Sequence, residues 1–332
     1  MATLGTTRPT LADVAKRTDR DGKISKIVEI LEETNAILED MSWTEGNLPT
    51  GHRTTVRSGL PTPTWRLLNF GVQPAKSRTV QVDETIGTLE AYSEIDQALA
   101  DLNGNTSEFR LSEDRGHIEG MNQEFANTLI YGNVGLDPEK FMGLAPRYNS
   151  TTAENGSNLI LGGGTESANT SIWLVCWGDM TAHGIYPKGS SAGLTVTDKG
   201  QVTIEDADGA GGGRMEAYRT HFAWKCGFSL RDWRYTVRIA NIDIGDLTKN
   251  AATGADLIDL MSQALEIMPG MKMGRCVFYV NRTVRSFLRR QIALRVVSNL
   301  TLDTVSGKTV MAFDGIPVKR VDAILNTEAT IA

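Results

Sequence analysis

The stretch that decides the fold is residues 53–66, RTTVRSGLPTPTWR. Its two prolines exclude a helix and a central strand, because proline lacks the N–H that either element needs. The flanking segments 53–57 and 78–82 favour strand, since they alternate or are rich in Thr and Val. Residues 48–82 are therefore predicted to form a long, exposed β-hairpin. A connection of this length with little core of its own is usually functional or disordered.

The predicted hairpin is basic and carries a large aromatic side chain. Its five cations meet almost no acid before Asp83. Trp65 favours a hairpin that lies on another surface, because a large aromatic ring on a projecting loop usually has something to bury against. A second copy of the chain is the natural surface, since most assemblies are homo-oligomeric; a mobile surface loop is the alternative. The predicted intersubunit contacts are Arg53, Arg57, Trp65, Arg66, Lys76 and Arg78.

Composition narrows the classes of protein that the chain can represent. It has 332 residues, of which 40% are hydrophobic and 22% charged, which is typical of a globular chain with one large or two ordinary domains. The net charge of −6 excludes a protein that binds nucleic acid through a surface that is basic throughout, but a local basic patch remains possible. Three cysteines without a CxxC pair argue against a disulfide scaffold and fit a reducing compartment. No membrane anchor or signal-peptide core is expected, because no apolar run approaches the ~20 residues of a membrane helix.

Apolar spacing and turn residues predict the other elements. Residues 1–22 are expected to be an extended arm, and residues 24–41 an amphipathic helix that lies on its own subunit or docks on a neighbour. Residues 106–131 are expected to form the longest helix, and 172–245 a meander-like antiparallel β block. The C-terminal part should contain a helix at 255–268, a strand at 276–280, a helix at 282–296, a hairpin within 309–318 and a strand at 321–325.

No motif in the sequence carries enzyme chemistry. The four histidines lack metal-ligand spacing, and the glycine runs 162–164 and 211–213 lack the pattern of a phosphate loop. We therefore expect no catalytic, cofactor or metal site. The helix predicted at 282–296 places Arg282, Arg285 and Arg289 on one face. That face could touch phosphates, although a solvated face or an intersubunit ion-pair surface is the favoured interpretation.

Several short motifs, taken in order, resemble a known family. They are LPTPTWR at 60–66, LIYGN at 129–133, GLAPRYN at 143–149, HGIYPKG at 183–189, RDWRY at 231–235 and RIANID at 238–243. Together they resemble the major capsid protein of short-tailed bacteriophages, in particular that of the Bordetella podovirus group, over nearly the whole chain.

The resemblance implies an α+β fold, the Hong Kong 97-like capsid fold. It implies an N-terminal arm at 1–48, an E-loop at 49–88, a peripheral domain at 89–245 with a spine helix at about 106–131, and an axial domain at 246–332. In the founding member of the fold, the axial unit follows the spine helix directly. Here the β block comes first, so we expect a reordered connectivity on the same architecture.

The resemblance also implies a structural function without catalysis or cofactors. Hexamers and pentamers would close into an icosahedral shell around the double-stranded DNA of a tailed phage, with the host cytoplasm as the place of assembly and the virion as the final location. Expected partners are a separate scaffolding protein, a portal protein, a decoration or cement protein, and packaged DNA through weak non-specific contacts; no membrane is expected. Covalent crosslinking through Lys76 is not expected, because no activating carboxylate is evident. The alternatives are a hydrolase with an unrecognised site in the β block, and a nucleic-acid-binding protein, which the net charge of −6 disfavours.

Overall fold

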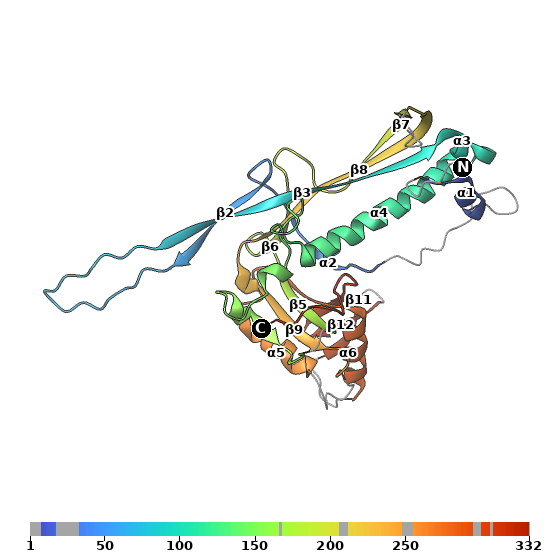
Figure 1. Ribbon diagram of the computed structural model, residues 1–332. Coiled ribbons are helices and arrows are strands. Elements are labelled where there is room, and N and C mark those ends of the chain that lie inside the picture. Colours follow the sequence, from blue (N-terminus) through green and yellow to red (C-terminus); the bar gives the residue numbers. More distant parts are fainter. Residues whose placement is uncertain are drawn as a thin grey trace. The chain divides into compact units, whose positions relative to one another are not determined.

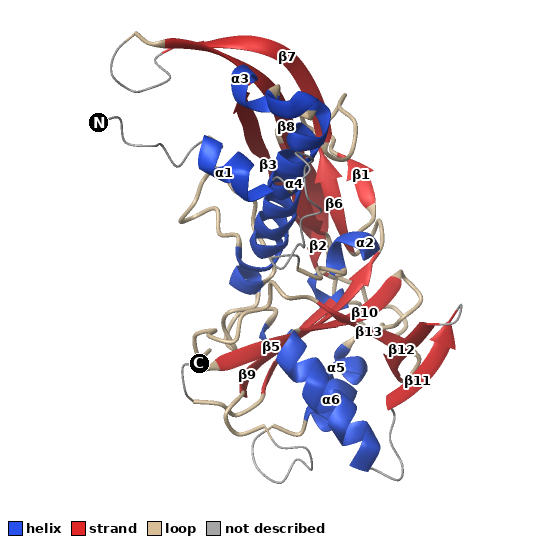
Figure 2. Cartoon of the chain, turned by 90° about the vertical axis from the view of Figure 1, so that its right-hand side faces the viewer, coloured by secondary structure: helices blue, strands red, loops and turns tan. Residues whose placement is uncertain are grey.

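The structure is a computed structural model of the chain. It describes residues 8–17, 33–165, 168–205, 212–247, 255–294, 300–305 and 308–331. The chain divides into two compact units (Figures 1 and 2). The first unit comprises residues 1–33, 88–125 and 193–225, and the second comprises 34–87, 126–192 and 226–332.

The first unit combines short helices and most of one long helix with long strands. It holds α1 (Leu11–Arg17), α3 (Gln97–Ala100) and most of α4 (Thr106–Tyr131), so the helix predicted at 106–131 is confirmed. Strand β7 (Thr195–Glu205) pairs antiparallel with β8 (Arg214–Leu230). The unit has a small core of its own, which comprises Val14, Ile95, Ala100 and Phe109.

The extended arm predicted at 1–22 is wrong for its described part, because residues 11–17 are the helix α1. The local reason is a cap: the Thr10 hydroxyl and backbone N–H both donate to Asp13 Oδ2, at 2.7 and 2.9 Å. These bonds satisfy donors that a helix start leaves free, and the LADVAKR run consists of residues that tolerate a helix. Composition alone did not reveal this cap.

The sheet of the second unit is built around β5 (Asn169–Trp177), which is buried along its whole length. Strand β5 pairs antiparallel with β9 (Thr236–Asp243) on one side and with β10 (Arg275–Val280) on the other. Strand β10 continues in parallel to β13 (Ile316–Arg320), followed by β12 (Lys308–Phe313) and β11 (Leu300–Val305). The β block predicted at 172–245 and the C-terminal strands therefore share one sheet.

Two helices cover one face of this sheet. They are α5 (Leu257–Ile267) and α6 (Arg282–Leu294), which confirms the helices predicted at 255–268 and, as far as the described residues go, at 282–296. Their buried apolar side chains join one cluster with every second residue of the neighbouring strands. This alternation is what a pleated strand requires when one of its faces meets helices. The cluster includes Leu257, Met261, Val284, Leu288, Leu174, Val237, Ile239, Phe278 and Val318.

Two further predictions, both about strands, need correction. The block is mixed rather than antiparallel, because β6 (Ala182–Tyr186) pairs in parallel with β5. In addition, β4 (Leu159–Leu161), which precedes the block, pairs in parallel with β9. The terminal strand predicted at 321–325 is absent: Val321 makes only an isolated bridge to Asn35, and the chain then turns.

The helix predicted at 24–41 falls partly outside the described residues. Residues 33–36 are not helical, and only α2 (Ile37–Asp40) is. The backbone there bonds to distant chain instead: Ala36 N–H donates to the Arg320 carbonyl, and Asp322 N–H donates to the Thr34 carbonyl. Tertiary pairing has overridden the helical spacing of the apolar residues.

The hairpin predicted at 48–82 is confirmed. Strand β2 (Gly51–Gly59) pairs antiparallel with the start of β3 (Arg78–Asp96), and the two strands run side by side into an open loop of residues 60–77 (Figure 1). A register shift between Arg57 and Gly59 ends regular pairing just before the prolines. Strand pairing could not continue regularly beyond this point, because the prolines lack the N–H groups that a strand donates to its neighbour.

Candidate functional site: the hairpin and its base

The loop at the end of the hairpin exposes a run of apolar side chains. Trp65 is 104% exposed and Leu68 84%. Clusters of large exposed apolar residues are uncommon on monomeric proteins and mark interaction sites. Sequence reasoning singled out Trp65 but missed its neighbours, although the LLNF run at 67–70 was the available signal. We call these residues the tip surface: Leu60, Trp65, Leu67, Leu68, Phe70 and Val72.

Arg53 already has a partner within its own chain. Its Nε and Nη2 donate to the two carboxylate oxygens of Asp83, at 2.6 and 2.7 Å, across the paired strands. The bond to Arg53 holds the pKa of Asp83 below its ordinary value. Arg53 was predicted to pair with an acid of a neighbour, and this internal pair gives it a role in holding the two strands in register.

The other predicted contact cations are exposed on the hairpin. Arg66 lies in the loop, where its Nη1 donates to the Phe70 carbonyl at 3.4 Å. Arg57, Lys76 and Arg78 are exposed and make no ion pair with any of the described residues. They remain available to acids outside the chain.

A buried ion pair holds the base of the hairpin. Glu84, on β3, is only 5% exposed and receives two bonds from Arg147, at 2.7 and 2.6 Å. Arg147 also donates to the Met142 and Gly143 carbonyls, both at 3.1 Å. Such a bidentate, charge-assisted pair is strong and geometrically specific. Arg147 belongs to the GLAPRYN motif, which therefore clamps the hairpin to its own unit.

Two buried histidines lie beside this clamp. His52, opposite Glu84 in register, has its Nε2 2.8 Å from Arg231 Nη2, and its ring packs edge-on against His183 with centroids 5.9 Å apart. Burial, with Arg231 and His52 nearby, lowers the pKa of His183 to about 4. Burial and Arg231 also lower the pKa of His52. Both rings are therefore neutral at neutral pH and belong to the packing of the hairpin base.

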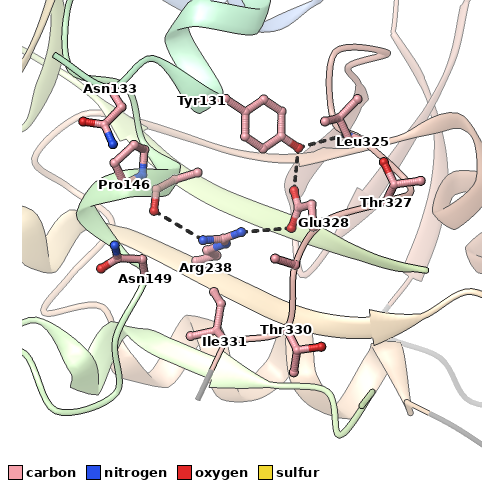
Figure 3. A pocket seen from close by; sticks show the side chains of 12 residues that line it. Tyr131, Asn133, Pro146, Asn149, Arg238, Leu325, Thr327, Glu328, Thr330 and Ile331 are labelled. Atoms are coloured by element: carbon pink, nitrogen blue, oxygen red, sulfur yellow. Dashed lines mark hydrogen bonds and ion pairs between the residues drawn. The ribbon is translucent and has the colours of Figure 1, made fainter. Parts of the chain in front are cut away.

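The residues near the C-terminus form a second buried polar network (Figure 3). Arg238 Nη2 lies 2.9 Å from Glu328 Oε2, and both side chains are about 5% exposed or less. Glu328 Oε1 also accepts from Tyr131 Oη at 2.5 Å and from Ser171 Oγ at 2.8 Å. The Leu325 N–H donates to Tyr131 Oη at 2.9 Å. We call Tyr131, Ser171, Arg238 and Glu328 the C-terminal network.

The C-terminal network borders a hollow of about 430 Å³, which is where a hydrolase site would be sought. The polar groups of the C-terminal network, however, already bond to one another. Burial and Glu328 raise the pKa of Tyr131, and both oxygens of Glu328 already accept bonds. A general acid or base needs a pKa near the working pH and a free position toward substrate. The network instead fastens the end of the chain to β5 and β9. It also joins three motifs, because Tyr131 lies in LIYGN, and Arg238 of RIANID donates to the Tyr148 carbonyl of GLAPRYN at 2.8 Å.

The first glycine run has a packing role. Gly162 and Gly164 N–H donate to the Ala240 and Asn241 carbonyls at 2.8 Å, so these groups are not free to cradle a phosphate. A Cβ at Gly164 would lie 2.7 Å from the Asn241 carbonyl oxygen, which explains the need for glycine. In the second run, Gly211 lies outside the described residues.

The described residues contain no group of three or more His, Cys, Asp or Glu side chains that could hold a metal ion. Within that same part of the chain, no helix is long and apolar enough to cross a membrane.

Comparison with known proteins decides the family. Residues 19–332 match the sequence model of the family described as major capsid protein GP7. This chain belongs to the major capsid protein GP7 family. The capsid chain is also similar to a chain in the near-atomic cryo-EM structure of bacteriophage Epsilon15, with 41% identity, a TM-score of 0.80, and coverage of 100% of this chain and 99% of that chain. A match to the capsid of bacteriophage JBD30 has 9% identity, a TM-score of 0.49, and coverage of 90% and 95%. No curated protein matches the capsid chain.

The family match and the similarity to the Epsilon15 chain confirm three predictions. The chain is a tailed-phage major capsid protein, its α+β fold is that of phage capsid proteins, and its family is structural rather than enzymatic. The hydrolase alternative finds no support in the family or in the committed groups of the C-terminal network.

Proposed function

We propose that this capsid protein assembles through its hairpin into hexamers and pentamers of an icosahedral shell around double-stranded DNA. The observation that carries the proposal is the tip surface, whose six apolar side chains are each at least 51% exposed. Burial of such side chains contributes about 25 cal/mol per Å² of apolar area. None of the described residues supplies that burial, because the loop at 60–77 is exposed throughout except for half-buried Ser77, so we assign it to another molecule.

The contact is proposed to have an apolar centre and a cationic rim. Trp65 is the central anchor, as expected of an interface in which aromatic residues dominate the binding energy. Arg57, Arg66, Lys76 and Arg78 surround it and pair with acids of the neighbour. The chain has 40 acidic against 34 basic residues, so a second copy offers an excess of such acids. Arg53 contributes indirectly, by holding β2 and β3 in register through Asp83.

We further propose the domain roles that the resemblance implies. Residues 1–48 act as the N-terminal arm, 49–88 as the E-loop, and α4 as the spine helix of the peripheral domain, which was expected to span 89–245. The pairing of β5 and β9 with β10 supports assigning these two strands to the axial unit, together with 246–332. A connectivity reordered relative to the founding member of the fold is consistent with a sheet whose central strand, β5, precedes its helices in the sequence.

The proposed partners follow from this role. They are a scaffolding protein, a portal protein and a decoration or cement protein, with weak, sequence-independent contacts to packaged DNA. Assembly would take place in the host cytoplasm and end in the virion shell. The shell is proposed to be held without covalent crosslinks, because Lys76 makes no contact with a carboxylate among the described residues.

The test compares assembly of the full chain and of a Trp65→Ala/Leu68→Ala variant. We expect the wild type to form closed particles, visible by electron microscopy and as megadalton species in sedimentation, and the variant to remain as subunits or capsomers. A Leu136→Ala variant is the matched control, because Leu136 is 78% exposed but lies outside the hairpin. Normal particles from the double variant would contradict the proposal.

A further inference from the structure

Five arginines gather around one hollow beside helix α6. Four come from α6 itself at helical spacing, and the fifth, Arg320, ends strand β13. The hollow has a volume of about 490 Å³ and, within the described part of the chain, only arginine and serine side chains line it. We call it the α6 arginine pocket; its residues are Arg282, Arg285, Ser286, Arg289, Arg290 and Arg320.

The α6 arginine pocket holds far more positive charge than the described residues around it neutralise. Among the described residues, its one acidic neighbour is Asp322, which accepts bonds from Arg320 and whose Oδ2 lies 3.5 Å from Arg282 Nη2. No carboxylate of the described residues pairs with Arg285, Arg289 or Arg290. Like charges three and four residues apart on a helix destabilise it. The arrangement therefore costs stability unless an anion from outside offsets it.

Arg285 is the most informative member of the pocket. It is only half-exposed, and its Nε is buried without a hydrogen-bond partner. Its neighbours are themselves cations: burial, Arg289 and Arg320 all lower the pKa of Arg285. A buried donor without an acceptor costs free energy, so such a group points to an acceptor that binds there. Arg290 is partly engaged, since its Nη2 donates to Ser286 Oγ at 3.0 Å and its guanidinium stacks over Phe287.

The lining favours a phosphate backbone over a partner polypeptide. Protein interfaces have an apolar centre with aromatic and aliphatic anchors, as the tip surface of this chain does. From the part of the chain that the structure describes, the α6 arginine pocket is lined by guanidinium groups and one hydroxyl, with no apolar side chain. Guanidinium groups match phosphate oxygens in pairs. A phosphodiester backbone carries charge at every nucleotide, and contacts to it fix position without reading sequence.

We propose that the α6 arginine pocket binds the phosphodiester backbone of double-stranded DNA without sequence preference. The proposal rests on the proposed function, since a shell that encloses a genome brings this ligand to the protein. The net charge of −6 did not exclude a local basic patch, and the proposal assigns that patch to the residues of the α6 arginine pocket.

The test measures binding of the full chain to a fluorescent 20-base-pair duplex of arbitrary sequence, by anisotropy over a range of salt. Each phosphate contact contributes about −0.9 to the slope of log affinity against log salt. The Arg285→Ala/Arg289→Ala variant should lose about two from the magnitude of that slope and bind more weakly at low salt. The matched control is Arg115→Ala/Arg214→Ala, which removes the same charge at exposed arginines outside the pocket and should bind as the wild type does. If the double variant fails to fold, a single Arg289→Ala variant, at an exposed position, replaces it. That variant should lose about one from the magnitude of the salt slope.

Several outcomes would overturn the proposal. Equal slopes for the pocket and control variants would show that the pocket does not bind DNA. A polyglutamate peptide that binds through Arg285 and Arg289 while the duplex does not would assign the pocket to an acidic polypeptide. Particle formation is scored on the same samples: normal shells with no pocket-dependent DNA binding would overturn this inference alone, whereas pocket-dependent binding without shells would overturn the assembly role alone.

Discussion

The tip surface and the C-terminal network differ in which groups they expose and which they bury. At the C-terminal network, charged groups are buried, and each finds its partners within the chain: Arg238 and Glu328 are about 5% exposed or less and lie 2.9 Å apart. At the tip surface, apolar groups are exposed and no described residue covers them, with Trp65 at 104% exposure. The first region shows what the subunit completes by itself, and the second shows what it leaves for another molecule to complete.

The largest effect should come from breaking the C-terminal network. Replacing Arg238 with Met leaves Glu328 buried without its cation, which should lower the free energy of unfolding by about 3–5 kcal/mol. Urea unfolding of unassembled subunits measures this. The double change Arg238→Met/Glu328→Met should cost less than the single one, because no charge is left uncompensated. A loss below about 1 kcal/mol for the single change would mean that the pair is not buried in solution.

The histidines at the hairpin base should make stability depend on pH. The folded-state pKa of His183 is about 4, below the ordinary 6.5, so the unfolded chain takes up a proton first as pH falls. Stability of up to about 3 kcal/mol is thus present above pH 6.5 and is lost between about pH 6.5 and 4, with no further loss from this group below that. His52 acts in the same direction.

The measurement is the unfolding free energy at several pH values from 7 to 5, where few carboxylates titrate. A His183→Gln variant serves as the comparison and should show a clearly flatter profile over this range. Parallel profiles for the variant and the wild type would mean that His183 is not buried as a neutral ring.

The tip surface should behave in the opposite way to the C-terminal network. Replacing Leu67 and Leu68 with Ser should change the unfolding free energy of the unassembled subunit by less than about 0.5 kcal/mol, because both side chains are already exposed. The same variant should assemble poorly. A large loss of subunit stability would mean that the tip packs on its own chain, and the comparison between the two regions would fail.

The smallest effect is expected for the Arg53–Asp83 pair. Both side chains are about half exposed, so an Arg53→Ala change should leave the midpoint of urea unfolding unchanged within error. Arg147→Ala is the contrasting variant, since it removes the partner of buried Glu84 and should shift the midpoint clearly. Equal shifts for the two variants would refute the distinction between a solvated and a buried ion pair on the same hairpin.

Local sequence signals predicted the elements that local forces stabilise. The spacing of apolar residues located α4, α5 and α6, and the prolines at 61 and 63 located the end of the paired hairpin. The same reasoning failed at residues 33–36 and 321–325, where backbone groups bond to distant chain. It also missed that Asp83 neutralises Arg53, because that pair depends on the register of two strands.

The sequence by itself determined that the chain has a basic, proline-interrupted hairpin with an aromatic tip, and no motif for catalysis. These properties follow from residue types within a few positions of one another. Only the tertiary structure decided that β5 unites the two predicted β regions, that Glu84 and Arg147 clamp the hairpin base, and that Arg320 completes the α6 arginine pocket. Each of these joins residues 30 or more positions apart, and such pairings depend on how the whole sheet packs, which no local pattern specifies.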